Sequence, residues 1–183
     1  MFNDKYGLTQ AVLDGRKTMT RRISKEQIRN SVFWKSGYES IHGYEIKPIY
    51  EIGEVVAIAQ SYSDCGNMPD LGLDEDGYPI MPKNSGFFNK MFVRANLMPH
   101  HIRITDVKVE RLQDISDGDC LKEGIEEHLK NVQYGFSSNI GYCGQYPFSN
   151  PREAFIALID KVSGKGTWES NPYVFVYEFE LAD

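Results

Sequence analysis

The sequence predicts an α+β fold built around a small curved sheet or barrel. Residues 102–112 alternate apolar and polar side chains, which is the pattern of a half-buried strand with room for one bulge. Residues 173–181 are rich in aromatic and β-branched side chains and predict a second major strand, and residues 55–59 predict a third after a Gly-Glu turn. Strand and helix patterns do not alternate regularly and no Gly-x-Gly-x-x-Gly occurs, so a doubly wound parallel sheet is not expected.

Short helices are predicted beside these strands. Residues 5–14 carry apolar side chains at helical spacing, and Gly15 stops the pattern. Ser116 has the chemistry of an N-cap for a short helix that ends at Gly124. Pro151 stands at the first position of an amphipathic helix, where its missing N–H costs nothing.

The chain of 183 residues has the length of one domain with a real core, so residues 1–183 are expected to form a single unit. Two stretches, near residues 63–90 and 131–150, are rich in residues that favour turns and loops. Loops of this length are frequently functional. We therefore expect two loop insertions in one domain.

Several classes of protein are disfavoured by composition. No apolar run approaches the ~20 residues of a membrane span, and the first residues lack the features of a signal peptide. The three cysteines are odd in number and form no Cys-x-x-Cys pair, which is typical of reduced thiols in a cytoplasmic protein. The four histidines show no ligand spacing, so neither a metal nor another cofactor is expected.

Positive charge is concentrated near the N-terminus of an acidic chain. The formal net charge is -6, yet residues 14–29 carry +4 and the remainder -10. Residues 15–22, Gly-Arg-Lys-Thr-Met-Thr-Arg-Arg, hold four cations and two hydroxyls. A local cationic site on an anionic body suits a specific anionic ligand better than non-specific coating of nucleic acid. The alternative is a solvated helix end with ordinary surface charges.

Within this segment, Lys17 and Thr20 are three residues apart. In a helical turn they would share one face, with about 5–6 Å between their Cβ atoms. A neutral lysine beside a hydroxyl can activate it as a nucleophile, which requires the lysine pKa to fall by about 3 units. Crowding by Arg16, Arg21 and Arg22 and partial burial both act in that direction.

Three further places carry two interpretations each. Glu123, in the last turn of a short helix, is either a general acid or a surface carboxylate. Trp168 and Asn171 precede the last strand, either as a platform on which a base stacks or as a turn with an aromatic packing lid. Phe87 and Phe88 could likewise stack bases or pack within their loop.

Four segments in this order resemble the ASCH domains, a PUA-like family that includes bacterial N(4)-acetylcytidine amidohydrolase. They are residues 15–22, residues 53–59, residues 107–125 and residues 168–174. The resemblance spans nearly the whole chain and implies a PUA-like β-barrel with flanking helices. It also implies a cleft lined by residues 15–22. The length and the two inserted loops resemble the longer ASCH proteins of bacteria and their phages.

The resemblance implies hydrolysis of the exocyclic amide of N(4)-acetylcytidine or a related acylated nucleoside. By motif match, Lys17 is the proton acceptor, Thr20 the nucleophile and Glu123 the proton donor. The ligand-binding residues expected around them are Arg16, Arg21, Arg22, Trp168 and Asn171. Arg21 departs from the compact enzymes, which often carry an apolar residue at that position.

A second interpretation remains open, a non-catalytic PUA-like module that binds RNA or a modified nucleotide. The expected partner is therefore a modified nucleoside or single-stranded RNA, and the sequence leaves the oligomeric state open. A closed pocket holding the three catalytic candidates favours the enzyme. An open cationic face that continues beyond the cleft favours the binding module.

Overall fold

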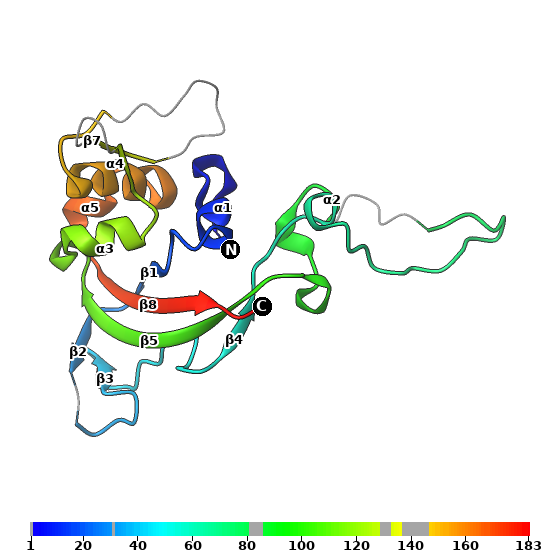
Figure 1. Cartoon of the computed structure of the whole chain (residues 1–183). Coiled ribbons are helices and arrows are strands. Elements are labelled where there is room, and N and C mark those ends of the chain that lie inside the picture. Colours follow the sequence, from blue (N-terminus) through cyan, green and yellow to red (C-terminus); the bar gives the residue numbers. More distant parts are fainter. Residues whose placement is uncertain (1, 31, 81–85, 129–132, 137–146) are drawn as a thin grey trace.

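The computed structural model describes residues 2–30, 32–80, 86–128, 133–136 and 147–183. A curved sheet carries helices on its concave face (Figure 1), so the predicted α+β class is confirmed in the form of a curled half-barrel. The sheet has four antiparallel strands in the order β1-β8-β5-β4. Their bounds are Met19–Ile23 for β1, Tyr173–Leu181 for β8, His101–Arg111 for β5 and Val55–Ala57 for β4.

The two long central strands were predicted from their side-chain patterns, and both are confirmed. β5 pairs with β8 along its length, and the register shifts between Ile104 and Asp106, where the expected bulge lies. In β8, Val174 and Val176 are fully buried and so is Tyr177 on the other face. A strand covered on both faces reads as a continuous apolar run, which explains why its alternation is weak.

The segment that holds Lys17 and Thr20 is not a helical turn, so the condition under which the two residues would share one helix face does not hold. The chain is extended from Met19 to Ile23 as β1, and Thr20 pairs with Tyr177 of β8. In a strand the side chains alternate between faces. Lys17 precedes this strand in the turn that follows Gly15, whose φ is +71°.

The helices on the concave face begin at polar N-caps, of which Ser116 was predicted. The Ser116 hydroxyl accepts from the Asp119 N–H at 3.1 Å, and the Asn150 side chain accepts from the Glu153 N–H at 2.8 Å. These caps open α3, Asp117–Lys122, and α4, Pro151–Ser163. The other helical elements of this side are η1, Asp4–Tyr6, α1, Leu8–Leu13, η4, Leu112–Asp114, and α5, Thr167–Ser170.

Two small hairpins accompany the main sheet. The first joins β2, Ile28–Asn30, to β3, Tyr38–Ser40, and lies on the convex side (Figure 1). The second joins β6, Glu126–His128, to β7, Gln133–Gly135. Neither hairpin was predicted, because strands of three residues are too short to show a period.

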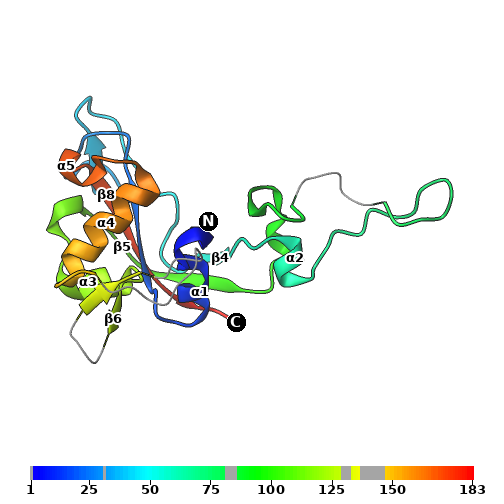
Figure 2. The same cartoon turned by 90° about the horizontal axis from the view of Figure 1, so that it is seen from above.

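The segment between β4 and β5 projects from the body in both views (Figures 1 and 2). It begins with α2, Tyr62–Cys65, continues as an extended arm, and returns through η2, Lys90–Phe92, and η3, Ala95–Leu97. This is the region expected to be a loop insertion near residues 63–90. Most of the other expected insertion, residues 131–150, lies outside the described residues. No helix in the described part of the chain has the length and apolar character needed to cross a membrane.

Candidate functional site

Lys17 is held in place by the turn between α1 and β1. The backbone N–H groups of Arg16 and Lys17 both donate to the Ala11 carbonyl, at 2.9 Å each. The Lys17 side chain is 2% exposed and points into the space between α3 and β1. Its Nζ donates to Glu123 Oε2 at 2.6 Å, to the Glu123 carbonyl at 2.7 Å and to the Met19 carbonyl at 2.7 Å. Three acceptors therefore match the three protons of an ammonium.

Glu123 reaches Lys17 from the end of α3, of which it is the C-cap. Gly124 follows with φ +100° and makes this approach possible. A Cβ at that position would lie 3.2 Å from a Leu8 methyl group and 3.5 Å from Lys17 Cδ. Only glycine tolerates both the backbone conformation and the close contact. Lys17 and Glu123 are 106 residues apart, so the tertiary fold, and not local sequence, pairs them.

Burial lowers the pKa of Lys17, because desolvation disfavours the ammonium, and the charges of Arg22 and Arg21 act in the same direction. The attraction and hydrogen bond of Glu123 oppose this shift. The direction is the one that a lysine base requires. The main cause of the lowered pKa is burial. The sequence interpretation had named crowding by neighbouring arginines and partial burial together.

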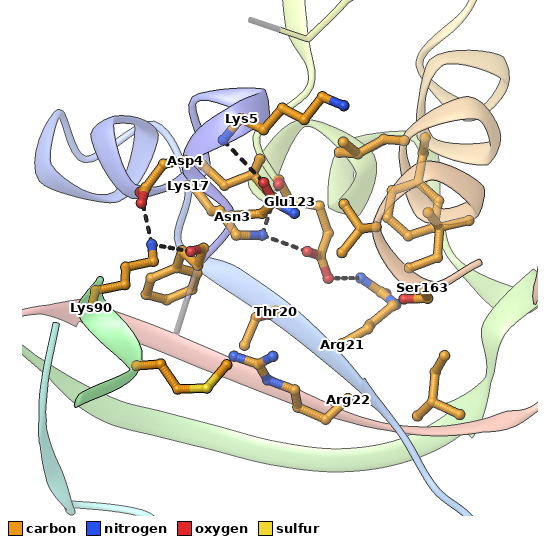
Figure 3. Close-up of a pocket in the computed structure, with 18 of the residues that line it drawn as sticks. Asn3, Asp4, Lys5, Lys17, Thr20, Arg21, Arg22, Lys90, Glu123 and Ser163 are labelled. Carbon is orange, nitrogen blue, oxygen red and sulfur yellow. Dashed lines mark hydrogen bonds and ion pairs between the residues drawn. The ribbon is translucent and has the colours of Figure 1, made fainter. Parts of the chain in front are cut away.

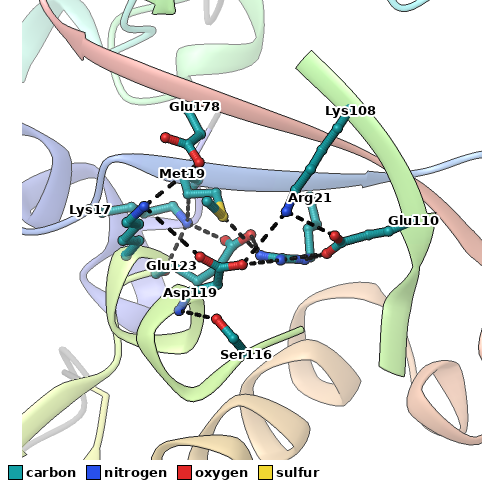
Figure 4. Close-up of polar contacts among 10 residues, drawn as sticks. Lys17, Met19, Arg21, Lys108, Glu110, Ser116, Asp119, Glu123 and Glu178 are labelled. Carbon is teal, nitrogen blue, oxygen red and sulfur yellow. Dashed lines mark hydrogen bonds and ion pairs between the residues drawn. The ribbon is translucent and has the colours of Figure 1, made fainter. Parts of the chain in front are cut away.

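Arg21 is a buried part of a carboxylate cluster (Figure 4). Its guanidinium, with a side chain only 1% exposed, donates to Glu123 Oε1 at 3.1 Å, Glu110 Oε1 at 2.6 Å and Asp119 Oδ2 at 3.3 Å. Burial alone would lower the pKa of Arg21, but the charges of Glu123 and Glu110 raise it above its ordinary value. The N–H donors of Arg21, which were expected to contact a ligand, therefore bind carboxylates of the protein itself. Glu123 is clamped between Lys17 on one oxygen and Arg21 on the other.

A pocket of about 660 Å³ lies beside the Lys17–Glu123 pair (Figure 3). The residues that line it include Lys17, Thr20, Arg22 and Glu123, so these four candidates come together, as the sequence interpretation expected. The volume falls within the range of small-molecule sites, about 300–1,000 Å³.

Nine apolar side chains contribute to the walls of this pocket, beside polar residues from the N-terminus and residues 89–90. One wall comes from α4, and the other comes from the N-terminus and from the segment that returns from the arm. The apolar lining residues are Phe2, Leu8, Ile23, Phe88, Met91, Phe155, Leu158, Ile159 and Val162. A polar floor between apolar walls suits a planar, partly polar ligand such as a nucleobase.

Thr20 and Arg22 lie on β1 and both line the pocket. They alternate with Met19 and Arg21, which are buried, whereas Thr20 and Arg22 are half-buried. The Thr20 hydroxyl makes no hydrogen bond to any other residue that the structure describes. It is therefore available to a ligand.

Three expected ligand-binding residues lie elsewhere. Arg16 pairs with Glu126 at 3.0 Å and with Asp14 at 3.1 Å, and it lines a separate hollow of about 380 Å³ beside α3. Arg16 does not line the pocket, although Lys17, its neighbour in the sequence, does.

Trp168 and Asn171 make contacts with other residues of the protein, away from the pocket. The Trp168 ring packs edge-on against Phe155, with 6.3 Å between centroids. Asn171 has φ +42°, and its side-chain oxygen accepts from the Gln113 N–H at 2.9 Å. Its carbonyl accepts from the Arg111 guanidinium at 3.1 Å. The packing interpretation of this segment agrees with these positions, and neither residue lines the pocket.

The N-terminal residues and α4 were missed as parts of the site. Lys90 fixes the returning segment against the N-terminus. Its amine donates to the Phe2 carbonyl, to Asp4 Oδ1 at 2.7 Å and to Thr9 Oγ1 at 3.0 Å. Phe88, which the sequence offered as a stacking residue, is exposed and lines the pocket next to this anchor. The sequence signal for α4 was its apolar stripe, which also serves the core and so did not point to a pocket.

In the described part of the chain, no group of three or more His, Cys, Asp or Glu side chains is arranged to hold a metal ion. The Glu110–Asp119–Glu123 cluster is filled by the Arg21 guanidinium.

Comparisons with known proteins add one structural similarity. No protein-family model matches the sequence, and no curated protein matches it. Among solved structures, the chain is similar to the crystal structure of an ASCH domain from Lactobacillus crispatus JV V101, with 13% sequence identity and a TM-score of 0.37. The similarity covers 99% of this chain and 76% of that one.

Proposed function

We propose that this protein is an amidohydrolase that acts on N(4)-acetylcytidine or a related acylated nucleoside. Thr20 is the nucleophile, Lys17 the proton acceptor and Glu123 the proton donor. The observation that carries the proposal is the Lys17–Glu123 pair, which lies 2.6 Å apart in the wall of a pocket that Thr20 also lines. The resemblance of residues 15–22 to the ASCH signature agrees with these roles.

The buried pair offers both an acid and a base from one proton transfer. Moving a proton from Lys17 Nζ to Glu123 Oε2, across their 2.6 Å hydrogen bond, gives a neutral amine and a neutral carboxylic acid. Burial makes this transfer easier than it would be in water, because it disfavours both ions, whereas the Arg21 guanidinium on Oε1 favours the carboxylate. The same transfer therefore prepares Lys17 to accept a proton and Glu123 to donate one.

In the acylation step the Thr20 oxygen bonds to the acyl carbon of the substrate, and its hydroxyl proton passes to Lys17. The bond between the acyl carbon and the exocyclic nitrogen then breaks. Glu123 gives its proton to the leaving nitrogen, which departs as the amine of cytidine. Lys17 and Glu123 end as ammonium and carboxylate, and Thr20 carries an ester. The cationic surroundings of Thr20 stabilise the oxyanion that forms on the way.

In the deacylation step water attacks the ester carbon and gives a proton to the Glu123 carboxylate. The ester bond to Thr20 breaks, and Lys17 returns a proton to the threonine oxygen. Acetic acid leaves, and the pair is again a neutral amine and a neutral acid. Each proton taken in one half-reaction is returned in the other, so the cycle needs no additional reactant.

A panel of acylated cytidines tests the proposal. Purified protein is incubated with N(4)-acetylcytidine and with longer-chain N(4)-acyl cytidines, and the release of acid and of cytidine is followed together. We expect equal amounts of both products. Thr18→Ala is a matched control, because Thr18 is the other threonine of the segment and does not line the pocket. Protein that releases neither product from any member of the panel would remove the amidohydrolase assignment.

One observation favours the second candidate, a non-catalytic module that binds a modified nucleotide or RNA. All three Lys17 protons have acceptors, so the ammonium form is well satisfied and can serve to hold β1 against α3. In that case the pocket binds its ligand through its walls and through Arg22. Binding without turnover distinguishes the two candidates.

A further inference from the structure

The pocket carries much more positive charge than the chain that contains it. Five cations and two carboxylates line it, a net charge of +3, whereas the whole chain has a net charge of -6. These residues are Lys5, Lys17, Arg21, Arg22, Lys90, Asp4 and Glu123. Glu110 and Asp119, which lie outside the lining, balance part of this charge at Arg21. An anionic protein with a cationic pocket attracts anions to that pocket more than to the rest of its surface.

Most of these charges have partners within the protein. Lys17 pairs with Glu123, and Lys90 pairs with Asp4 at 2.7 Å. Arg21 is enclosed by carboxylates, as described above. These groups shape the pocket without offering a free charge at its mouth.

Lys5 differs from the other lysines of the pocket. Its side chain is exposed, and its amine lies 5.7 Å from the centroid of the Tyr6 ring. It makes no ion pair with any residue in the described ranges. Figure 3 shows Lys5 at one margin of the pocket and Arg22, on β1, at the opposite margin. Both residues line the pocket.

We propose that the ligand of this pocket carries a phosphate group, which Lys5 binds at the mouth and which the charge of Arg22 also attracts. Charge-assisted hydrogen bonds to a phosphate are shorter and stronger than those to a neutral hydroxyl. Only the nucleoside part of the ligand rests on the proposed function. The phosphate rests on the charge and position of the pocket residues.

A phosphate of this kind has two sources, a free nucleotide and the backbone of a single strand. The volume of about 660 Å³ accommodates one nucleotide, with its base between the apolar walls. The chemistry that Lys5 recognises is the same in both cases, so the two sources are separate arms of one experiment.

The test is titration calorimetry with cytidine, cytidine 5′-monophosphate and a short oligocytidine. We expect the monophosphate to bind wild-type protein about tenfold more tightly than cytidine at low salt. Raising the salt from about 50 to about 200 mM should weaken binding of the monophosphate and leave that of cytidine unchanged. An oligocytidine that binds more tightly than the monophosphate, with a steeper salt dependence, identifies a strand as the source. Equal affinity for the oligocytidine and the monophosphate identifies the free nucleotide as the source.

Two single variants separate a local effect from a change in net charge. Lys5→Gln should weaken monophosphate binding by about three- to tenfold and leave cytidine binding unchanged. Lys47→Gln removes the same charge from a side chain that is 71% exposed and does not line the pocket, and it should change neither.

Three results would overturn the phosphate proposal. They are equal affinity of wild-type protein for cytidine and its monophosphate, equal effects of the two variants, and no monophosphate binding at millimolar concentration. The outcome is independent of the hydrolysis assay. Protein that binds the monophosphate and hydrolyses nothing retains the phosphate site and loses the amidohydrolase. Protein that hydrolyses N(4)-acetylcytidine without preferring the monophosphate retains the amidohydrolase and loses the phosphate site.

Discussion

The Lys17 ammonium and the Glu123 carboxylate form an ion pair that water barely reaches. Their charged atoms lie 2.6 Å apart, and the two side chains are 2% and 6% exposed. A buried pair of this kind contributes little net stability compared with apolar residues, but removing one partner leaves an uncompensated charge. A buried pair that stabilises the fold less than apolar residues would is consistent with a functional role for the pair.

Breaking this pair should destabilise the protein strongly. We expect Lys17→Met to lower the free energy of unfolding by about 3–5 kcal/mol, because Glu123 is left buried with Arg21 as its remaining partner. Lys17→Met combined with Glu123→Gln should cost less than the sum of the single changes, because the double variant removes both charges. Urea unfolding followed by circular dichroism measures all three variants. Additive losses would show that the two residues do not stabilise each other.

Arg21 should matter for stability more than any exposed arginine. Arg21→Met leaves the carboxylates of Glu110, Asp119 and Glu123 facing one another, and we expect a loss of about 3–5 kcal/mol. Arg29→Met is the control. Arg29 also pairs with a carboxylate, Glu39 at 2.6 Å, but its side chain is 59% exposed, so the expected loss is below about 1 kcal/mol. Similar losses for the two variants would contradict the assignment of Arg21 to a buried cluster.

The sequence predicted the parts of the fold that depend on local patterns. β5 is long enough to show its period, β8 is a long run of aromatic and β-branched side chains, and the Ser116 cap acts within three residues of its partner. β1 was not predicted because its five residues, Met-Thr-Arg-Arg-Ile, show neither a helical nor a strand period of apolar residues.

The partners of the site residues could not be predicted, because they come from distant parts of the chain. Arg21 meets Glu110 across 89 residues and Lys17 meets Glu123 across 106. The motif placed Lys17, Thr20, Arg22 and Glu123 near one another, but only tertiary structure separates Arg16 from them. Sequence proximity is therefore a poor guide to which cation of the segment faces the ligand.

The thiol of Cys120 should be much less reactive than that of Cys65. Burial raises the pKa of Cys120 from 9.0 to about 12, and the residue is fully buried, whereas Cys65 is partly exposed. At about pH 8.5, iodoacetamide should label Cys65 well before Cys120, as measured by peptide mapping. Comparable labelling rates in folded protein would contradict the burial of Cys120.

The raised pKa of Cys120 also predicts a trend of stability with pH. Between pH 9.0 and about 12 the folded protein retains the thiol proton while the unfolded chain loses it. The folded state then binds more protons, so the contribution of this thiol to stability is complete below pH 9.0 and declines as the pH rises through this window. Cys120→Ala should remove that part of the alkaline decline.

Lys90 should control the order of one pocket wall. Lys90→Met removes the contacts of its amine with Phe2, Asp4 and Thr9, so the returning segment loses its anchor on the N-terminus. We expect faster amide hydrogen exchange in residues 2–9 and 86–92 and little change in β5 and β8. Lys108→Met, which removes an amine on β5 that pairs with Glu110 and not with the N-terminus, is the control. Unchanged exchange in residues 86–92 would show that other contacts hold the wall.

The final prediction separates catalysis from binding at Lys17 and Thr20. If Thr20 is the nucleophile and Lys17 its base, Thr20→Ala and Lys17→Ala should each reduce hydrolysis by at least about a hundredfold. Their combination should be no worse than either alone, because residues that act as one unit are strongly non-additive. Lys17→Arg should be nearly as damaging as Lys17→Ala, since a guanidinium stays protonated and cannot accept a proton.

A binding module behaves differently: Lys17→Arg retains most affinity because the charge persists, and Thr20→Ala has little effect. Hydrolysis and calorimetric binding of a cytidine analogue are measured on the same variants, with Thr18→Ala as the control and circular dichroism as the check on folding. Wild-type protein that binds the analogue without turnover, together with normal binding by Lys17→Arg, would leave the binding module as the function of this pocket.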